Sequence, residues 1–394
     1  MSEFREYKLS ELGKWLGGGT PSKAKKEYWL DGTIPWVSPK DMKKLRIDSS
    51  ADYITQIAVE KTSAKLIPKG SVLIVTRSGI LQRYVPIAIN EVPVTINQDL
   101  KVIIPNGKIR SDFLANSLRL QNNRVLHECA KVGTTVESLG TDLLKGFKIV
   151  APDIDVQDRI MAIIGTWDEA ISKTEKLIHA KKRYKKGLMQ RLLSGKVRFP
   201  EFEVEDWVEV KLGEVFKERN DKGFDDLKLV AITTKNGVID RDELDRRDTS
   251  SDDKSNYKRI LPGDIGYNTM RMWQGVSGYS ELEGIVSPAY TIVTPVEEKV
   301  AGLFMSYLFK HPPVIDLFRR YSQGLVSDTL NLKYKNFAQI KLMIPPSIEE
   351  QKKIACVFME IDNEINLIKK EVALYQKQKK GLMQQLLTGK VRVN

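Results

Sequence analysis

The chain has 394 residues, of which 29% are charged and 41% are hydrophobic. These values are ordinary for a soluble globular protein, and a count of two cysteines excludes a disulfide scaffold. The net charge of +12 favours a polyanionic partner, most often nucleic acid, although a generically basic surface explains the charge equally well. The sequence shows no apolar signal core and no run near the roughly 20 apolar residues of a membrane span, so we expect a cytoplasmic protein without a membrane partner.

Residues 1–152 form the first predicted domain. Short β-branched runs bounded by Gly, Pro and Asn predict strands at 71–76, 86–89 and 100–104. Helical spacing predicts a helix over 111–124, with Ser111 as a candidate cap. This mixture indicates an α+β domain with many loops.

Residues 153–196 change to a long helical pattern. Apolar residues recur at steps of four and three through Ile160, Ile164, Trp167 and Ile171, which is the seam of a left-handed coiled coil. Asp153 occupies the capping position, and Gly195 lies where a glycine ends a helix.

Residues 197–345 predict a second α+β domain on a similar scaffold. KLGEV at 211–215 repeats KLSEL at 8–12, and LPGDIG at 261–266 takes the place of PKGSVL at 68–73. The remaining loops differ strongly between the two domains, as expected if similar scaffolds read two different targets.

Residues 346–394 repeat the helical pattern at an offset of 194 residues, since GLMQRLLSGKVR at 187–198 returns as GLMQQLLTGKVR at 381–392. Ser347 with Glu350 predicts a capping box, and Gly389 predicts the helix end. Each helix of about 40 residues would span about 60 Å.

The two helices can pair within one molecule, pair between molecules, or pack separately on their own domains. We expect an antiparallel pair within one chain, because duplication supplies a two-fold axis. Gly187 and Gly381 interrupt the helices, where glycine costs about 1 kcal/mol relative to alanine, and they indicate close helix approach, a partner surface, or drift after duplication. The candidate residues for helix–helix contact or partner docking are Gly187, Leu188, Leu192, Ile354, Phe358, Ile361, Ile365, Gly381, Leu382 and Leu386.

The sequence lacks a recognisable catalytic set. The GK pairs at 195–196 and 389–390 are followed by valine, where a P-loop needs Ser or Thr. No Asn/Asp-Pro-Pro-aromatic motif of an amino-methyltransferase occurs, and the three histidines are far apart in sequence. We therefore predict no catalytic residue, no metal site and no cofactor in this chain.

Side chains of the types that contact DNA gather in predicted loops of both domains. Lysine and arginine neutralise phosphates, Asn and Gln pair with adenine, and Arg pairs with guanine. For any single residue, a solvated or buried structural role is the alternative, and for Trp29 and Trp36 core packing is favoured. The basic runs at 181–186 and 377–380 are either solvated faces or tracks for DNA. The candidate DNA-binding residues are Lys23, Lys25, Lys26, Arg77, Ser78, Arg83, Arg246, Arg247, Asn268, Arg271, Trp273 and Gln274.

Together these motifs resemble type I restriction–modification specificity (S) subunits over the whole chain. GGTPS at 18–22, YW at 28–29 and IPW at 34–36 resemble the start of a target-recognition domain, and GTTV at 133–136 resembles its closing segment. In the second domain, 268–275 followed by GIVSPAY at 284–290 resembles another variant of that domain. The helical regions also match, except that Val156-Gln157 stands where the second copy has Glu350-Gln351.

The resemblance implies an α+β fold with two similar target-recognition domains, joined and spaced by two long antiparallel helices with an internal pseudo-two-fold. It implies a non-catalytic reader of double-stranded DNA, in which each domain reads one half of a bipartite, asymmetric target. The helices would set the spacing and dock methyltransferase (M) subunits, expected to be two, and restriction (R) subunits would join the assembly. S-adenosylmethionine, ATP and Mg would then belong to those partners. The alternative function is a coiled-coil assembly scaffold without sequence-specific DNA binding.

Overall fold

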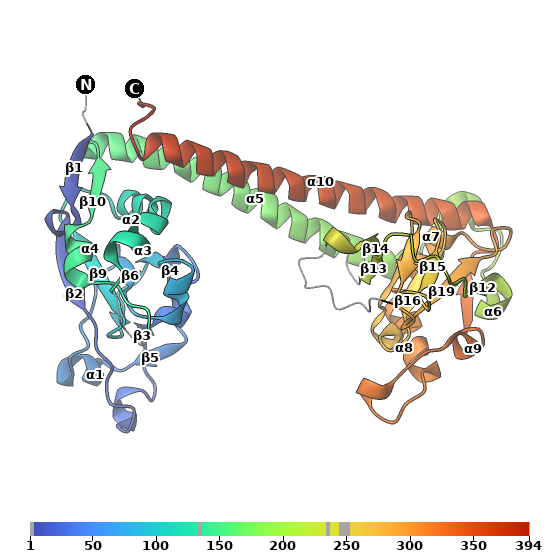
Figure 1. Cartoon of the computed structure of the whole chain (residues 1–394). Helices are drawn as coiled ribbons and strands as arrows, with labels where there is room; N and C mark the ends of the chain where they lie inside the picture. The colour runs from blue at the N-terminus through green and yellow to red at the C-terminus, as the bar shows by residue number, and fades with distance from the viewer. Residues whose placement is uncertain (1–3, 132–135, 234–236, 244–252, 394) are drawn as a thin grey trace. The chain divides into compact units, whose positions relative to one another are not determined.

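The computed structural model describes residues 4–131, 136–233, 237–243 and 253–393. The chain divides into two compact units, one made of residues 1–174 and 371–394 and the other of residues 175–370. Each unit therefore combines one globular domain with one part of each long helix, α5 (Ile154–Leu192) and α10 (Ile348–Leu386). Helix α5 is green and helix α10 is red in Figure 1. We refer to the two compact units as unit 1 and unit 2.

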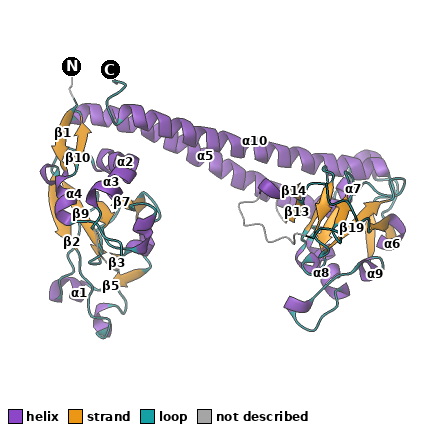
Figure 2. Cartoon of the chain, in the orientation of Figure 1, coloured by secondary structure: helices purple, strands orange, loops and turns teal. Residues whose placement is uncertain are grey.

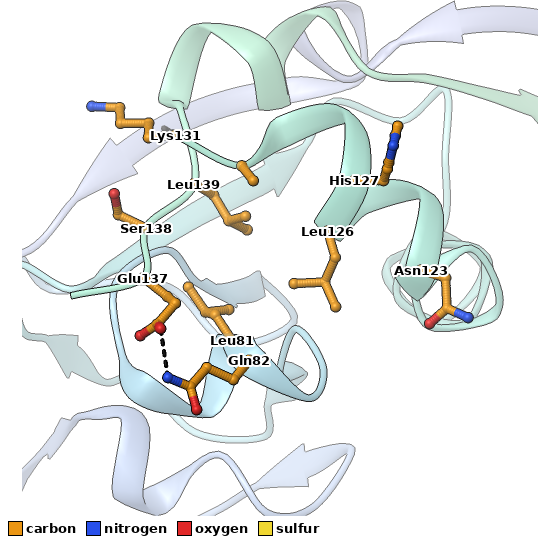
Figure 3. A pocket seen from close by; sticks show the side chains of 10 residues that line it. Leu81, Gln82, Asn123, Leu126, His127, Lys131, Glu137, Ser138 and Leu139 are labelled. Atoms are coloured by element: carbon orange, nitrogen blue, oxygen red, sulfur yellow. Dashed lines mark hydrogen bonds between the residues drawn. The ribbon is translucent and has the colours of Figure 1, made fainter. Parts of the chain in front are cut away.

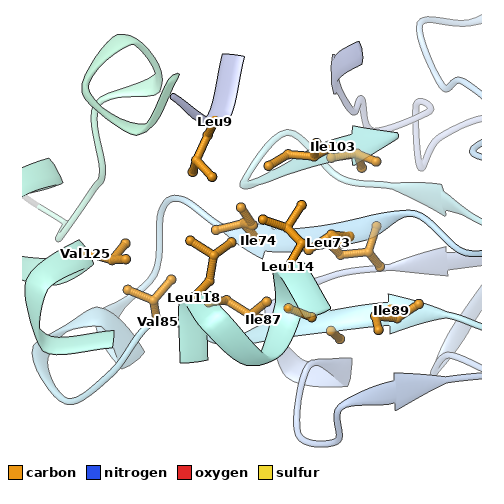
Figure 4. Close-up of a cluster of buried hydrophobic side chains, with 14 of the residues drawn as sticks. Leu9, Leu73, Ile74, Val85, Ile87, Ile89, Ile103, Leu114, Leu118 and Val125 are labelled. Carbon is orange, nitrogen blue, oxygen red and sulfur yellow. The ribbon is translucent and has the colours of Figure 1, made fainter. Parts of the chain in front are cut away.

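Unit 1 is built on a five-stranded sheet in the order β2-β9-β6-β7-β4. The three predicted strands are confirmed as β6 (Val72–Val75), β7 (Ile87–Asn90) and β9 (Leu100–Pro105). Leu114 and Leu118 of the covering helix α2 (Ser111–Leu120) lie against Ile74 and Ile87 of the sheet (Figure 4). The edge strands are β2 (Gly13–Gly17) and β4 (Arg46–Ile47).

The helix predicted over 111–124 is wrong in its length and cap. It ends at Leu120, and α3 (Asn122–Cys129) begins after Gln121. The side-chain amide of Asn122 bonds both backbone groups of Val85, at 2.8 Å each, which fixes the start of the second helix. Ser111 does not cap α2, because its hydroxyl donates to the carbonyl of Gly70 and the capping position is Arg110.

A smaller sheet in unit 1 has the order β5-β3-β8, with β3 at Ile34–Val37, β5 at Asp52–Ile54 and β8 at Thr95–Ile96. Helix α1 (Gln56–Lys61) follows β5. Core packing of Trp36 is confirmed, because its side chain is buried and its indole N–H donates to Gly19 O at 3.0 Å. Trp29 is half-buried and meets Trp36 edge-on at 5.3 Å between ring centroids.

Unit 2 repeats the central part of this scaffold with a four-stranded sheet in the order β12-β19-β16-β17. Figure 2 shows the strands with the helices around them. The strands are β12 (Phe216–Arg219), β16 (Ile265–Asn268), β17 (Ser277–Tyr279) and β19 (Tyr290–Pro295), and the helices are α7 (Gly302–Leu308) and α8 (Pro312–Tyr321). Two further strand pairs are β13 (Val230–Thr233) with β14 (Gly237–Asp240), and β15 (Lys258–Ile260) with β18 (Gly284–Val286).

The sequence anchors shared by the two domains occupy equivalent places. The strand pair β1 (Arg5–Lys8) with β10 (Lys148–Ala151) corresponds to β11 (Val208–Lys211) with β20 (Lys341–Ile344). The KLSEL and KLGEV segments follow β1 and β11 as the 3-10 turn η1 (Leu9–Glu11) and helix α6 (Leu212–Val215). Gly70 and Gly263 both have positive φ, 81° and 94°, in the turns that lead into β6 and β16. Before β10 and β20 lie α4 (Thr141–Gly146) and α9 (Tyr334–Phe337).

A buried glutamine ties the start of each long helix to its domain. Gln157 accepts from the backbone N–H of Arg110 at 2.9 Å and donates to Pro152 O at 2.8 Å. Gln351, the equivalent residue of the second copy, accepts from Ala301 N–H at 2.8 Å and donates to Pro345 O at 2.8 Å. Arg110 and Ala301 are the capping residues of α2 and α7. An equivalent glutamine side chain therefore joins the long helix to the start of an equivalent short helix in each unit.

The two long helices pair antiparallel within each unit. In unit 2, Lys181 of α5 pairs with Glu364 of α10, and one turn later Lys185 pairs with Asp362. In unit 1, Trp167 meets Tyr375 edge-on at 5.9 Å, and Lys379 pairs with Asp168. The seam positions Ile354, Phe358, Ile361 and Ile365 are buried, as are Ile160 and Ile164. The intramolecular pair is confirmed, and separate packing of each helix on its own domain is wrong.

The predicted helix ends are correct except for one side chain. Gly195 and Gly389 have positive φ, 68° and 73°, as helix-terminating glycines do. Ser347 caps α10 by accepting from Glu350 N–H at 3.3 Å. The returning half of the capping box is wrong, because the Glu350 carboxylate is buried against Arg198 instead.

Gly187 and Gly381 do not mark close helix approach, which corrects one of the three interpretations above. A Cβ built at either residue meets no atom of the described residues within 4 Å. A partner surface or drift after duplication remains as the explanation. Among the described helices, none has both the length and the apolar run that a membrane span requires.

Candidate nucleic-acid interface

A threonine holds three loop segments together in each domain. Thr76, at the end of β6, donates to Asp99 O through its backbone N–H at 2.7 Å and its hydroxyl at 3.0 Å. Thr269, at the end of β16, donates in the same way to Ala289 O, at 3.1 Å and 2.8 Å. The carbonyls of the two threonines accept from Leu139 N–H at 2.7 Å and Leu332 N–H at 2.8 Å. These matching bonds assign Thr76 and Thr269 to equivalent positions.

The same three kinds of segment therefore meet in both domains. The first is the loop after β6 or β16, and the second is the short stretch just before β9 or β19. The third is the segment that follows α3 in the first domain and α8 in the second. That third segment is closed by paired backbone groups in both cases, Lys131 with Ser138 and Gln323 with Asn331. We call these surfaces reader face 1 and reader face 2. Loops held on a rigid sheet in this way are where binding residues commonly lie.

Reader face 1 contains Arg77 and Ser78. The Arg77 guanidinium is exposed and lies 3.6 Å from the Asp99 carboxylate. The Ser78 hydroxyl accepts from Ile80 N–H at 3.4 Å, and the backbone N–H of Ser78 donates to Glu137 O at 3.1 Å. Arg77 can therefore reach outward, while Ser78 mainly shapes the loop.

Lys23, Lys25 and Lys26 lie on the segment that joins β2 to β3. Lys23 lies over the Trp29 ring at 5.9 Å, Lys25 lies over the Tyr28 ring at 5.2 Å, and Lys26 is exposed. The segment starts beside reader face 1, because the Thr20 hydroxyl donates to the side chain of Gln98, next to Asp99. Sequence reasoning missed Gln98, although it is an exposed amide two residues before β9.

A hollow of about 450 Å³ adjoins reader face 1, and Figure 3 shows the side chains that line it. Gln82, from the 3-10 turn η4 (Gly79–Gln82), donates to the Glu137 carboxylate at 2.5 Å across one wall. That bond lowers the pKa of Glu137. His127 and Lys131 lie on another side. Arg83 follows η4 and is exposed.

Reader face 2 contains four predicted residues, one at the end of β16 and three in the loop after it. Arg271 and Gln274 are exposed, and Arg271 has no side-chain hydrogen bond or ion pair within the described part of the chain. Asn268 accepts from Met270 N–H at 3.0 Å, and the Trp273 indole N–H donates to Met270 O at 3.0 Å. Arg271 and Gln274 are thus free to contact a ligand, while Asn268 and Trp273 also shape the loop.

Two predictions fall outside the described residues. Arg246 and Arg247 lie there, as does most of the GTTV segment at 133–136. Sequence reasoning also missed four exposed cations near reader face 2. Two lie in the last turn of α8, one caps α9 and one lies within α9: Arg319, Arg320, Lys333 and Lys335.

The predicted docking residues on the helices separate into two groups. Leu192, Ile354, Phe358, Ile361, Ile365 and Leu386 are buried in the units, whereas Gly187 is exposed and Leu188, Gly381 and Leu382 are half-buried. The buried residues serve the helix pair and domain cores. Exposed apolar side chains at seven-residue spacing lie elsewhere, at Leu177 and Tyr184 on α5 and at Leu367 and Leu374 on α10.

The basic runs are partly used inside the protein. Lys181, Lys185 and Lys379 form ion pairs with the other helix. Lys182, Arg183, Lys186, Lys377 and Lys380 are exposed. In the part of the chain that the structure describes, no group of three His, Cys, Asp or Glu side chains is arranged to hold a metal ion.

The chain is similar to known proteins along most of its length. The family model for the type I restriction modification DNA specificity domain matches residues 1–181 and 293–374. The EcoR124I/EcoR124II specificity subunit of Escherichia coli is 46% identical over 160 residues, 41% of this chain and 40% of that protein. The MjaVIII specificity subunit of Methanocaldococcus jannaschii is 28% identical over 311 residues, 73% of this chain and 72% of that protein.

The fold also matches solved structures. The S subunit of a type I restriction-modification system from M. genitalium has a TM-score of 0.55 at 15% identity, covering 98% of this chain and 96% of that one. The subunit from Thermoanaerobacter tengcongensis has a TM-score of 0.52 at 16% identity, covering 98% and 97%. At these identities the match shows the fold alone.

The family model covers well over half of the residues, and the two-domain, two-helix fold agrees with it. The chain therefore belongs to the family of type I restriction–modification DNA specificity subunits.

Proposed function

We propose that this chain reads a bipartite, asymmetric DNA target, with reader face 1 on one half-site and reader face 2 on the other. The observation that carries the proposal is the pair of equivalent threonines, Thr76 and Thr269. They hold the same three segments in both domains, while the residues on those segments differ. Equal frames with unlike side chains are what two unlike half-sites require.

The chemistry of the exposed residues supports hydrogen bonds to base edges as well as contacts to phosphates. Arg77 and Arg271 can each present a guanidinium to guanine, and Gln98 and Gln274 can present amides to adenine. The exposed lysines near both faces suit phosphate contacts, which position a protein without specifying sequence.

We propose that the long helices dock two methyltransferase subunits. Leu177, Tyr184, Leu367 and Leu374 are exposed at heptad spacing, outside the seam of the helix pair. Apolar stripes of this kind are suited to partner helices. S-adenosylmethionine, ATP and Mg would be bound by the methyltransferase and restriction subunits, and this chain would contribute recognition without catalysis.

Two matched protein variants, each altered in one reader face, test the proposal. Arg271→Ala should weaken binding to the half-site of reader face 2 by about 1–3 kcal/mol and leave discrimination at the other half unchanged. Arg77→Ala should show the reverse pattern. Lys182→Ala, on the exposed side of α5, is the control and should leave both half-sites readable.

Binding should be measured with the chain co-purified with its methyltransferase subunit, against duplexes carrying single base changes. Equal loss across all duplexes would reassign both arginines to phosphate contacts. Binding that ignores DNA sequence, with intact partner assembly, would favour the scaffold alternative.

A further inference from the structure

The segment Gln323–Asn331 projects from reader face 2 with an apolar tip. Seven successive residues, 323–329, are exposed. Leu325 is fully exposed, and Val326 is 59% exposed. We call this segment the tip loop.

The tip loop has a defined shape. Gln323 and Asn331 exchange two backbone hydrogen bonds of 2.8 Å, which close its base. Thr329 donates to Val326 O through its N–H and its hydroxyl, at 3.0 Å each. Gly324 has a φ of 142°, and a Cβ there would lie 2.6 Å from Thr329 O, so the turn requires glycine. Leu325 is thus presented on an ordered turn.

The tip loop is rooted in reader face 2. Leu332, directly after its base, is buried and donates its N–H to Thr269 O at 2.8 Å. Helix α8, which leads into the loop, packs against the loop after β16, where a Cβ at Gly275 would lie 2.8 Å from Ile315. The base of the tip loop is therefore held next to the loop that carries the predicted base-reading residues.

The charges around the tip loop suit a polyanion. From 319 to 335 there are four cations, Arg319, Arg320, Lys333 and Lys335, and one carboxylate, Asp328. Within the described part of the chain, the four cations have no ion-pair or side-chain hydrogen-bond partner. An apolar tip flanked by free cations fits a duplex, in which an apolar side chain contacts base faces while the cations contact the phosphates.

We propose that Leu325 is a wedge that enters the duplex between two adjacent base pairs of the half-site read by unit 2 and partly unstacks them. This inference rests on the proposed function and deepens it. Apolar side chains used in this way kink DNA and make recognition depend on how easily a base step deforms. The step at Leu325 would thus be read through its deformability, without a hydrogen bond to either base.

The first domain supplies a matched substitution. Its corresponding segment has Thr134 and Thr135 after Gly133, where the tip loop has Leu325 and Val326 after Gly324. The double variant L325T/V326T places these polar, β-branched residues at the tip and keeps Gly324 and Thr329. L325M keeps an apolar side chain of similar size. V204S removes another exposed apolar side chain of unit 2, beside Arg198 and Ser347.

The test uses the full chain co-purified with its methyltransferase subunit and duplexes that carry 2-aminopurine at each successive step of the half-site. The fluorescence of 2-aminopurine rises when its base unstacks. The parent complex should show a rise at one step, which L325T/V326T should abolish while weakening specific binding by about tenfold, the lower range for burial of a leucine side chain. L325M and V204S should behave like the parent.

Four results would overturn the proposal. Sequence-specific binding without a rise at any step, or a rise that persists in L325T/V326T, would remove the wedge and leave the proposed function intact. Loss of methyltransferase assembly in L325T/V326T would make the tip loop a protein contact. Absence of sequence-specific binding by the parent would end both the wedge and the proposed function.

Discussion

Lys185 donates to the carboxylate of Asp362 across 2.5 Å, joining α5 to α10 in unit 2. The residues one repeat away, Lys379 and Asp168, form the corresponding ion pair in unit 1. The duplication is therefore preserved as a physical contact as well as a sequence pattern. The two pairs differ in their surroundings. Asp362 also accepts from the Tyr307 hydroxyl at 2.9 Å, whereas Asp168 has Lys379 as its side-chain partner among the described residues.

This difference predicts unequal stability effects. Asp362→Asn should destabilise unit 2 by about 1–2 kcal/mol, because a neutral amide oxygen accepts more weakly than a carboxylate from both Lys185 and the Tyr307 hydroxyl. Asp168→Asn should cost less than about 1 kcal/mol, as exposed ion pairs do. Hydrogen exchange resolved on α7 and on both ends of α10 measures the two effects. A larger loss in Asp168→Asn would contradict this reading.

The buried ion pair of Arg198 with Glu350 predicts a larger effect. The guanidinium makes two bonds to the carboxylate, at 2.9 and 2.7 Å, and Glu350 is fully buried. These bonds raise the pKa of Arg198. Glu350→Gln should cost about 3–5 kcal/mol, because it leaves a largely buried cation without its counter-charge.

A double variant separates the charge effect from simple loss of packing. The first copy has Val156 where the second has Glu350, so the junction tolerates an apolar residue. Arg198→Met with Glu350→Val should recover most of the stability in chemical denaturation. A double variant as unstable as Glu350→Gln would show that the shape of the pair, and not its charge, stabilises the junction.

The long-range organisation was predictable because it rests on periodicity and repetition. The seam through Ile354 and Phe358 and the glycines at 195 and 389 have direct physical causes in the chain itself. The Glu350 carboxylate was misassigned because a local capping pattern competed with Arg198, a partner 152 residues away. Such a distant partner leaves no local signal.

The reader faces were only partly predictable. Arg77 and Arg271 lie in loops after strands, where composition indicates a binding role. The tip loop was missed because Leu325 and Val326 have the composition of a core segment, and only the fold places them in solvent. The threonines were missed because the carbonyl groups that accept from Thr76 and Thr269, those of Asp99 and Ala289, are brought to them only by the fold.

The open space at Gly187 and Gly381 predicts stabilisation by alanine. In the part of the chain that the structure describes, no atom lies within 4 Å of a Cβ at either position, so Gly187→Ala and Gly381→Ala should each stabilise the chain by about 1 kcal/mol. Thermal unfolding of the isolated chain measures this. Binding to the methyltransferase subunit then separates the remaining explanations, since weaker assembly indicates a partner surface and unchanged assembly indicates drift. A destabilised alanine variant would contradict the observed geometry.

His311 predicts a loss of stability in mild acid. It is buried at the start of α8, and burial lowers its pKa below the usual 6.5. The unfolded chain therefore binds a proton at a pH where the folded chain does not, so stability from neutral His311 is present above pH 6.5 and falls as the pH drops below it. His311→Asn should lose less stability than the parent between pH 7.5 and 5.5, as followed by denaturant unfolding, and an equal loss would contradict the assignment.

Bipartite reading by this chain can be measured by selection from a randomised duplex pool, with the chain co-purified with its methyltransferase subunit. We expect a gapped motif with two unlike halves and a fixed gap, in which Arg271→Ala relaxes one half and Arg77→Ala relaxes the other. A palindromic motif would mean that the two reader faces recognise the same sequence or that the chain dimerises. Recovery of no motif, with binding that follows only salt concentration, would contradict sequence-specific reading by this chain.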